Sequence, residues 1–279
     1  MKRREIISKI IFFILAFICA AIMMLPLIWM VMQSLQSDPL AIYNIPPKFN
    51  GKPTLKAYKD VFADWNILLL FFNTMKIMVG NVLLTILSSL LCGYGFARFK
   101  AKGKRIMFAL LMSTMMLPWS VTLIPSYAVW SKLGLLGTYL PLILPSIGGG
   151  AFNIFLVRTF IMNIPKSLDE AAEIDGCNKM QILFRILIPQ LTPVIATILV
   201  FQFTGVWNDY VGPYTYLWGF TEKYTLSIKL AISFKSEMGV MDWPKFMAGA
   251  TIISLPVILV TFFAQNAFTR GIVMSGLKE

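Results

Sequence analysis

The sequence contains no histidine, which excludes imidazole acid–base catalysis and removes the commonest metal ligand. Its three cysteines, Cys19, Cys92 and Cys177, are scattered, and two of them lie in long apolar runs, so no disulfide framework is predicted. Charge is scarce as well: 14% of the residues are charged, whereas soluble domains carry about a quarter. These shortages argue against an ordinary soluble enzyme.

Motifs for nucleotide and metal chemistry are also missing. The order G-x-x-x-x-G-K-[ST] does not occur, so we expect this chain not to bind ATP itself. The glycine- and lysine-bearing stretch GYGFARFKAKGKR, residues 93–105, lacks that order and indicates a basic turn. Neither a metal-ligand cluster nor an activated nucleophile is evident. We therefore predict no catalytic residue, no metal site and no cofactor on this chain.

Apolar residues, by contrast, make up 57% of the 279 positions, and the mean hydropathy is +0.73. A bilayer core about 30 Å thick needs roughly 20 apolar helical residues to cross it, and helices are the default because lipid offers no partners for backbone groups. The sequence therefore predicts an all-α, polytopic membrane protein.

Six uncharged runs are long enough to cross the bilayer. Because the first of them exceeds the h-region of a signal peptide, we expect an uncleaved first span. We predict one transmembrane domain, residues 1–279, without a soluble domain. Its spans are placed at about 10–33, 68–98, 106–130, 139–163, 186–210 and 246–269, with outer loops at 34–67 and 211–245 and a cytoplasmic loop at 164–189.

The net charge of +12 reflects how lysine and arginine are divided between the two sides of the membrane. It does not indicate a basic patch for binding nucleic acid. Most of the lysines and arginines lie in the N-terminus, the C-terminus and the short loops on the same side, which is the bias of cytoplasmic segments. Both termini and loop 164–189 are therefore predicted to be cytoplasmic. Prolines such as Pro118 and Pro193 are expected to bend or interrupt spans.

The loop at 164–189 has the pattern of a helical hairpin. Ser167 and Glu170 form an S-x-x-E capping box that predicts a helix start. Gly176 suits a left-handed helix end, and Asn178 with Gln181 predicts a second start. The second helix would place Met180, Leu183 and Phe184 on one side. Ala171 and Ala172 would form a small face beside the carboxylates. From these local features the hairpin is either a connector or a docking element for a cytoplasmic partner.

The run EAAEIDG, followed by ILIPQLTP, resembles the EAA loop of permease subunits in bacterial ABC importers. The wider segment IPKSLDEAAEIDGCNKMQILFRILIPQLTP is similar to the carbohydrate-importing branch, and NT at 73–74, VWNDY at 206–210, YTLSIKL at 224–230 and QNAFTRGIVMSGLK at 265–278 resemble further landmarks. The likeness extends over nearly the whole chain, and its nearest form is the smaller, six-span permease of maltose-type importers.

The resemblance implies that the loop, here the coupling hairpin (164–189), docks on an ATPase. It implies as partners a second homologous permease in a heterodimer, two ABC ATPase subunits that bind ATP and Mg, an extracytoplasmic sugar-binding protein and the lipid bilayer, but no nucleic acid. The ATPase-coupling residues it assigns are Glu170, Ala171, Ala172, Glu173, Asp175, Gly176, Met180 and Phe184. The resemblance also implies an ATPase-contacting tail of Ser275, Gly276, Leu277 and Lys278.

A translocation path is expected to involve Asn73, Trp207, Asn208, Asp209 and Tyr210. Aromatic residues at 207–218 are placed either for stacking on sugar rings or in an interfacial belt.

Three other functions compete with sugar import: a permease for another solute such as glycerol phosphate, an ion-coupled secondary transporter and a membrane scaffold. The spans carry little charge for a charged solute and no buried ionisable site for ion coupling.

Overall fold

The computed structural model describes residues 2–38, 42–43, 48–49, 51–233 and 241–276, and the side chains of those between Ile7 and Ala264. Every regular element in these ranges is a helix, as predicted. Contacts divide the chain into two compact units, which are described separately: residues 1–67 with 229–255, and residues 68–228 with 256–279.

The first unit holds α1 (Lys2–Ser34), α2 (Lys56–Asp64) and the first part of α14 (Trp243–Gly276). Trp65, 3% exposed, lies against Gly249 of α14, where a Cβ atom would fall 2.3 Å from the indole. Lys245 forms an ion pair with Asp64, and its hydrogen bond and positive charge lower the pKa of the Asp64 carboxyl. The last residues of the predicted outer loop, Asp64 and Trp65, are thus held on the start of the last helix.

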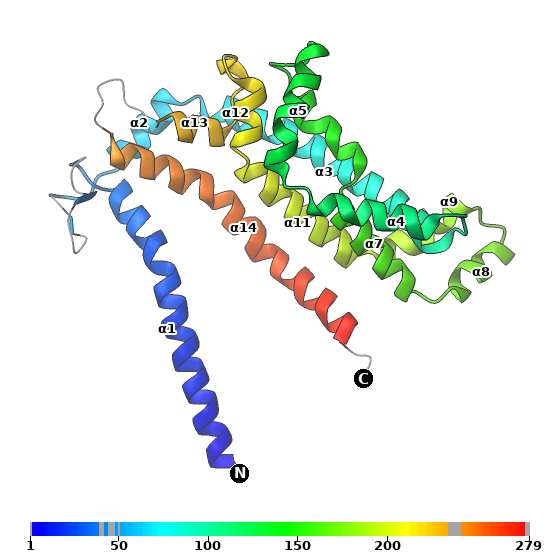
Figure 1. Ribbon diagram of the computed structural model, residues 1–279. Helices are drawn as coiled ribbons and strands as arrows, with labels where there is room; N and C mark the ends of the chain where they lie inside the picture. The colour runs from blue at the N-terminus through cyan, green and yellow to red at the C-terminus, as the bar shows by residue number, and fades with distance from the viewer. Residues whose placement is uncertain (1, 39–41, 44–47, 50, 234–240, 277–279) are drawn as a thin grey trace. The chain divides into compact units, whose positions relative to one another are not determined.

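The second unit contains most of the other helices (Figure 1). Their bounds are α3 (Ile67–Arg98), α4 (Lys104–Ser113), η2 (Thr114–Met116), α5 (Trp119–Lys132), α6 (Leu140–Ile143), η3 (Leu144–Gly148), α7 (Ala151–Asn163), α8 (Ser167–Ile174), α9 (Lys179–Gln181), η4 (Ile182–Leu187), α10 (Ile188–Gln190), α11 (Thr192–Asn208), α12 (Val211–Leu217) and η5 (Thr221–Lys223). The helix α13 (Leu226–Ser233) crosses the boundary between the units.

Helices occupy all six ranges predicted to span the membrane. Four are long and apolar enough to cross: Ile7–Ser34, Ile67–Arg98, Leu140–Asn163 and Trp243–Ala264. Two further ranges are bent pairs: Lys104–Met116 with Trp119–Lys132 at 97°, and Lys179–Gln190 with Thr192–Asn208 at 78°. The described residues therefore contain four candidate spans, or up to six if each bent pair is one span.

Proline accounts for the position of both bends. Leu117 is extended directly before Pro118, since the proline ring disfavours helical geometry in the preceding residue. At the second bend, Pro193 occupies the first turn of α11, where its missing donor costs nothing. Pro26 and Pro256, by contrast, lie inside continuous helices. The expectation that proline interrupts spans is confirmed at two positions and not at these.

The buried core of the second unit gathers where α3, α7, η4 and α11 meet α8. It consists of Leu90, Tyr94, Val157, Ile161, Ala172, Ile182, Leu183, Leu187, Leu191, Val194 and Ile198. Gly93 lets α3 and α7 approach closely, because a Cβ atom there would lie 2.5 Å from Cγ1 of Val157.

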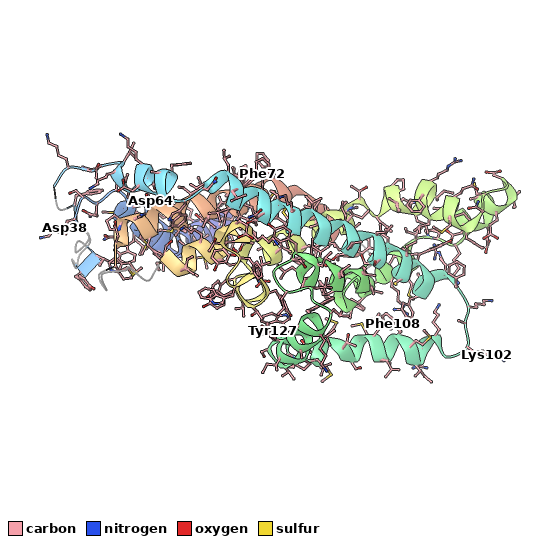
Figure 2. The ribbon with its side chains drawn as sticks, turned by 90° about the horizontal axis from the view of Figure 1, so that it is seen from above. Asp38, Asp64, Phe72, Lys102, Phe108 and Tyr127 are labelled. Carbon is pink, nitrogen blue, oxygen red and sulfur yellow. The ribbon has the colours of Figure 1, made fainter. Side chains whose placement is uncertain are left out.

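In Figure 2, Lys102 marks the turn between α3 and α4, and Phe108 lies on α4. The Arg158 guanidinium lies 4.2 Å from the centre of the Phe108 ring.

Candidate functional site

The first helix of the hairpin, α8, starts differently from the prediction. The backbone N–H groups of Asp169 and Glu170 donate to the carbonyl of Lys166, at 2.9 and 3.1 Å, and Leu168 donates to Pro165. No side chain caps the helix, so the predicted capping box of Ser167 with Glu170 is wrong. The physical reason is that Lys166, at the N-cap, already has helical backbone angles (φ −68°, ψ −21°), which places Ser167 inside the first turn.

The turn between the hairpin helices follows the prediction. Gly176 has a φ of +83°, and the N–H groups of Gly176 and Cys177 donate to the carbonyls of Glu173 and Ala172, at 3.0 and 2.9 Å. These two bonds form a Schellman motif, which glycine favours because it lacks a Cβ atom. The predicted second cap is also confirmed: Asn178 and Gln181 exchange side-chain to backbone hydrogen bonds at 2.9 and 2.8 Å.

Beyond that cap, the chain forms a π-helical segment, η4, rather than a regular α-helix. Ile182, Leu183 and Leu187 are fully buried, whereas Met180 and Phe184 are about half exposed. The prediction that Leu183 shares a side with Met180 and Phe184 is therefore wrong. The wider turn of a π-helix changes which residues face the core, and the sequence pattern contained no signal for it.

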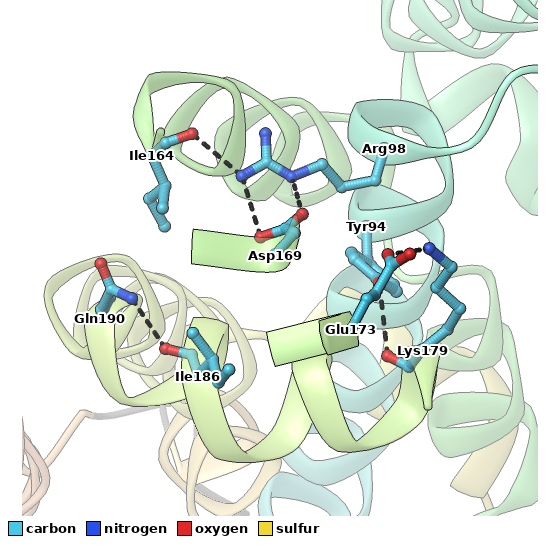
Figure 3. A network of polar contacts seen from close by, with 8 residues as sticks. All are labelled: Tyr94, Arg98, Ile164, Asp169, Glu173, Lys179, Ile186 and Gln190. Atoms are coloured by element: carbon cyan, nitrogen blue, oxygen red, sulfur yellow. Dashed lines mark hydrogen bonds and ion pairs between the residues drawn. The ribbon is translucent and has the colours of Figure 1, made fainter. Parts of the chain in front are cut away.

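A buried ion pair joins α8 to the end of α3 (Figure 3). Nε of Arg98 lies 2.6 Å from Oδ2 of Asp169, and the two side chains are 7% and 13% exposed. A terminal nitrogen of Arg98 also donates to the carbonyl of Ile164, at 2.9 Å, just after α7. One guanidinium thus connects α3, α7 and α8. Sequence reasoning assigned neither partner to the site, because 71 positions separate them and neither carries a local signal.

A second set of contacts holds the turn of the hairpin. Lys179 forms an ion pair with Glu173 across the glycine turn, with both side chains about half exposed. The hydroxyl of Tyr94, on α3, donates to the carbonyl of Lys179 at 3.2 Å. An exposed ion pair contributes little to stability, because water screens its charges. The tyrosine bond and the core beneath therefore do more to position α9.

The predicted coupling residues divide into two groups. Ala172 is buried in the chain's own core, so the predicted small face shared by Ala171 and Ala172 is wrong. The exposed group consists of Glu170, Ala171, Glu173, Asp175, Gly176, Met180 and Phe184. Ile174, which sequence reasoning missed, is 87% exposed beside them. An uncovered mixture of carboxylates and large apolar side chains is typical of a protein-docking surface.

The predicted path residues are also separated by the fold. Asn73 is buried and donates to the carbonyls of Glu222 and Tyr224, at 2.9 and 3.1 Å, so it ties α3 to the segment before α13. Trp207 is 2% exposed and stacks on Phe203. These contacts place both side chains in packing roles in this conformation.

The remaining path residues lie in two places. Tyr210 lies beside Tyr214, with ring centres 5.1 Å apart. Asn208 and Asp209 line an open cavity of about 430 Å³ in the second unit. Of the predicted tail, Leu277 and Lys278 and the side chains of Ser275 and Gly276 lie outside the described residues.

Comparison with known proteins identifies the family. The family described as binding-protein-dependent transport system inner membrane component matches residues 85–274. This chain belongs to that family. It is 33% identical over 287 residues to the galactooligosaccharides transport system permease protein GanQ of Bacillus subtilis (strain 168), covering 100% of this chain and 98% of GanQ. It is 30% identical to the lactose transport system permease protein LacG of Rhizobium radiobacter, over 92% of each chain.

Solved structures support the same fold. A bacterial ABC transporter involved in the import of the acidic polysaccharide alginate contains a chain that matches with a TM-score of 0.82, at 24% identity, over 95% of this chain and 97% of that one. The MetNI methionine ABC transporter matches with a TM-score of 0.54, at 16% identity, over 73% and 95%. The family match and the relatives named above identify this chain as the membrane-spanning permease of an ABC importer.

Proposed function

We propose that this permease carries a sugar or oligosaccharide across the cytoplasmic membrane, as part of an ATP-driven importer. The support is that three relatives are named for transport of galactooligosaccharides, lactose and polygalacturonan or rhamnogalacturonan, and the alignments cover 98%, 92% and 100% of them. These substrates share the chemistry of a polyhydroxylated ring. The whole chain forms one transmembrane domain in this proposal, with both termini in the cytoplasm, as the distribution of basic residues favours.

The hairpin is the observation that carries the proposal. Its exposed carboxylates, Glu170 and Asp175, and its exposed apolar side chains, Ile174 and Phe184, offer a surface to a separate ATPase subunit. Two such subunits would bind ATP and Mg and perform the hydrolysis, while this chain stays non-catalytic. A second homologous permease and an external sugar-binding protein complete the assembly.

The contacts of Arg98 suggest how force passes from the hairpin to the spans. Because one guanidinium connects Asp169 of α8 with the ends of α3 and α7, a push on α8 moves all three helices together. Closure of the ATPase would thus be transmitted as a rigid-body movement between inward-facing and outward-facing states. The ATPase supplies the energy, and the hairpin supplies the mechanical connection.

The test is reconstitution of the complete importer in proteoliposomes with tritiated oligosaccharides, the binding protein outside and ATP inside. We expect accumulation of a sugar. Glu170→Lys should lower uptake by tenfold or more, because a charge-assisted contact contributes about 1.5–3 kcal/mol. Lys102→Glu, a charge reversal in the turn between α3 and α4, is the matched control and should import normally. Absence of ATP-dependent uptake of any sugar would refute the proposed substrate class.

A further inference from the structure

A second arginine lies near the same end of the second unit as Arg98, but it has no counter-charge in the described part of the chain. Arg158 lies on α7, and its guanidinium packs 4.2 Å from the centre of the Phe108 ring of α4. Its Nε is buried without a hydrogen-bond partner, and it forms no ion pair with any described carboxylate. Arg98, by contrast, is held by Asp169 and by the carbonyl of Ile164.

An arginine in this position needs an anionic partner. The guanidinium stays charged in proteins, so it cannot avoid the cost of burial by losing its proton. A charge taken out of water without a counter-charge is unfavourable. The Phe108 ring offsets part of this cost through a cation–π contact, but it accepts no ordinary hydrogen bond from Nε. The unpaired guanidinium of Arg158 therefore points to an anion that the described chain does not provide.

Two lysines add positive charge around Arg158. Lys104 begins α4 one helical turn before Phe108, so the two side chains lie on the same side of that helix. The charges of Arg158 and Lys166 both act on Lys104, which places the three cations within electrostatic range of one another. Lys166 lies at the N-cap of α8 and is exposed. No side chain caps the start of α4, where the helix dipole also favours an anion.

The surface that continues from these cations is apolar. Lys104, Met107 and Leu110 are spaced by three residues, so they follow one another along one side of α4. Met107 and Leu110 are both more than half exposed. A phospholipid has the same order of features, because a charged phosphate is followed by acyl chains. The turn before α4 is predicted to be cytoplasmic, and the cytoplasmic leaflet carries anionic lipids.

We propose that Arg158, Lys104 and Lys166 bind the phosphate of an anionic phospholipid in the inner leaflet. Arg158 would hold the phosphate through its planar fork of donors, and the two lysines would add attraction. The acyl chains would lie along Met107 and Leu110. Because Lys166 begins α8, the lipid would fasten the coupling hairpin to α4 and α7. The proposal does not depend on which solute the importer carries.

The test is lipid binding to the whole purified importer in an uncharged maltoside detergent, measured by native mass spectrometry. The probes are dioleoyl phosphatidylglycerol, dioleoyl phosphatidylcholine and inorganic phosphate. Arg158→Gln should weaken the tightest binding of phosphatidylglycerol about tenfold or more, the effect of one lost charge-assisted contact. Arg105→Gln is the matched control, because it removes the same charge from an exposed arginine next to Lys104, and it should leave this binding nearly unchanged. Phosphatidylcholine should bind equally to the native importer and to Arg158→Gln, and inorganic phosphate should not displace phosphatidylglycerol.

A second readout separates lipid binding from a purely structural role of Arg158. Phosphatidylglycerol should raise the unfolding temperature of the native importer, and Arg158→Gln should lose this rise. In lipid-free maltoside, Arg158→Gln should be no less stable than the native protein, because the native guanidinium has no counter-charge there. Arg158→Lys keeps the charge but not the planar fork, so it should restore part of the effect of the lipid.

Four outcomes would overturn the proposal. Equal binding of phosphatidylglycerol by the native importer and by Arg158→Gln would show that the lipid binds elsewhere. A lower unfolding temperature of Arg158→Gln in lipid-free maltoside, with the lipid-dependent rise intact, would assign Arg158 to packing alone. Displacement of the lipid by inorganic phosphate would assign the three cations to free phosphate. Absence of tight phosphatidylglycerol binding to the native importer would show that another subunit covers them.

Discussion

Arg98 and Asp169 belong to a basic loop and an acidic helix start, and only the fold brings their side chains within 2.6 Å. Such a buried pair adds little net stability compared with an apolar pair, yet removal of one partner leaves an uncompensated charge. The pair therefore makes the attachment of α8 to α3 specific. Asn73 plays a comparable role at the other end of α3, where it holds two backbone carbonyls.

Loss of Arg98 should be costly. We expect Arg98→Ala to destabilise the protein by about 3–5 kcal/mol, because Asp169 stays buried without its counter-charge. Arg98→Leu combined with Asp169→Leu should recover most of that loss. Equilibrium unfolding in mixed detergent micelles measures both. Lys179→Ala, which breaks the exposed pair with Glu173, is the control and should cost far less, because water screens an exposed pair. Equal costs for Arg98→Ala and Lys179→Ala would contradict the importance assigned to the buried pair.

At the scale of elements, the turn of the hairpin is specified by its own residues. The rest of the hairpin takes its conformation from packing against the core. The left-handed Gly176 and the Asn178 cap are local devices, and both were predictable. The π-helical η4 was not, because its register follows from the burial of Ile182 and Leu187 in the core beneath it.

The turn at Gly176 offers a test of geometry separate from stability. Gly176 and Gly103 both have positive φ angles, +83° and +76°, and neither has an atom within 4 Å of a would-be Cβ. Valine at either position should cost about 1–3 kcal/mol from backbone strain alone. We expect only Gly176→Val to lower the sugar imported per ATP hydrolysed, because only this turn orients the docking surface. A similar fall in this ratio for Gly103→Val would show that strain, rather than the hairpin, is responsible.

At the scale of the whole molecule, sidedness is the property that joins the hairpin to a cytoplasmic motor. With the native cysteines replaced by serine, Asp175→Cys should react with a membrane-impermeant maleimide in inside-out vesicles and not in intact spheroplasts. Lys132→Cys, which is predicted to lie outside, should show the opposite pattern. Labelling of Asp175→Cys from the outside would contradict the predicted topology and the docking role together.

Local composition and short motifs by themselves determined the helical membrane class, the helix ranges, the family resemblance and the hairpin turn. These properties depend on runs of apolar residues and on bonds between near neighbours, which a linear sequence displays directly. The tertiary structure decided which side chains face outward: Ala172 is buried, Ile174 is exposed, and Asn73 is buried and bonded to backbone carbonyls.

The tertiary structure also decided which polar side chains from different helices meet. Arg98 meets Asp169, and Asn81 meets Gln202 and Asp209 at one cavity, although these residues lie on different helices. The reason is that a distant pair leaves no periodicity in the chain. Its partners are set by how helices cross, and crossings such as that of α3 and α7 at Gly93 depend on packing of the whole unit.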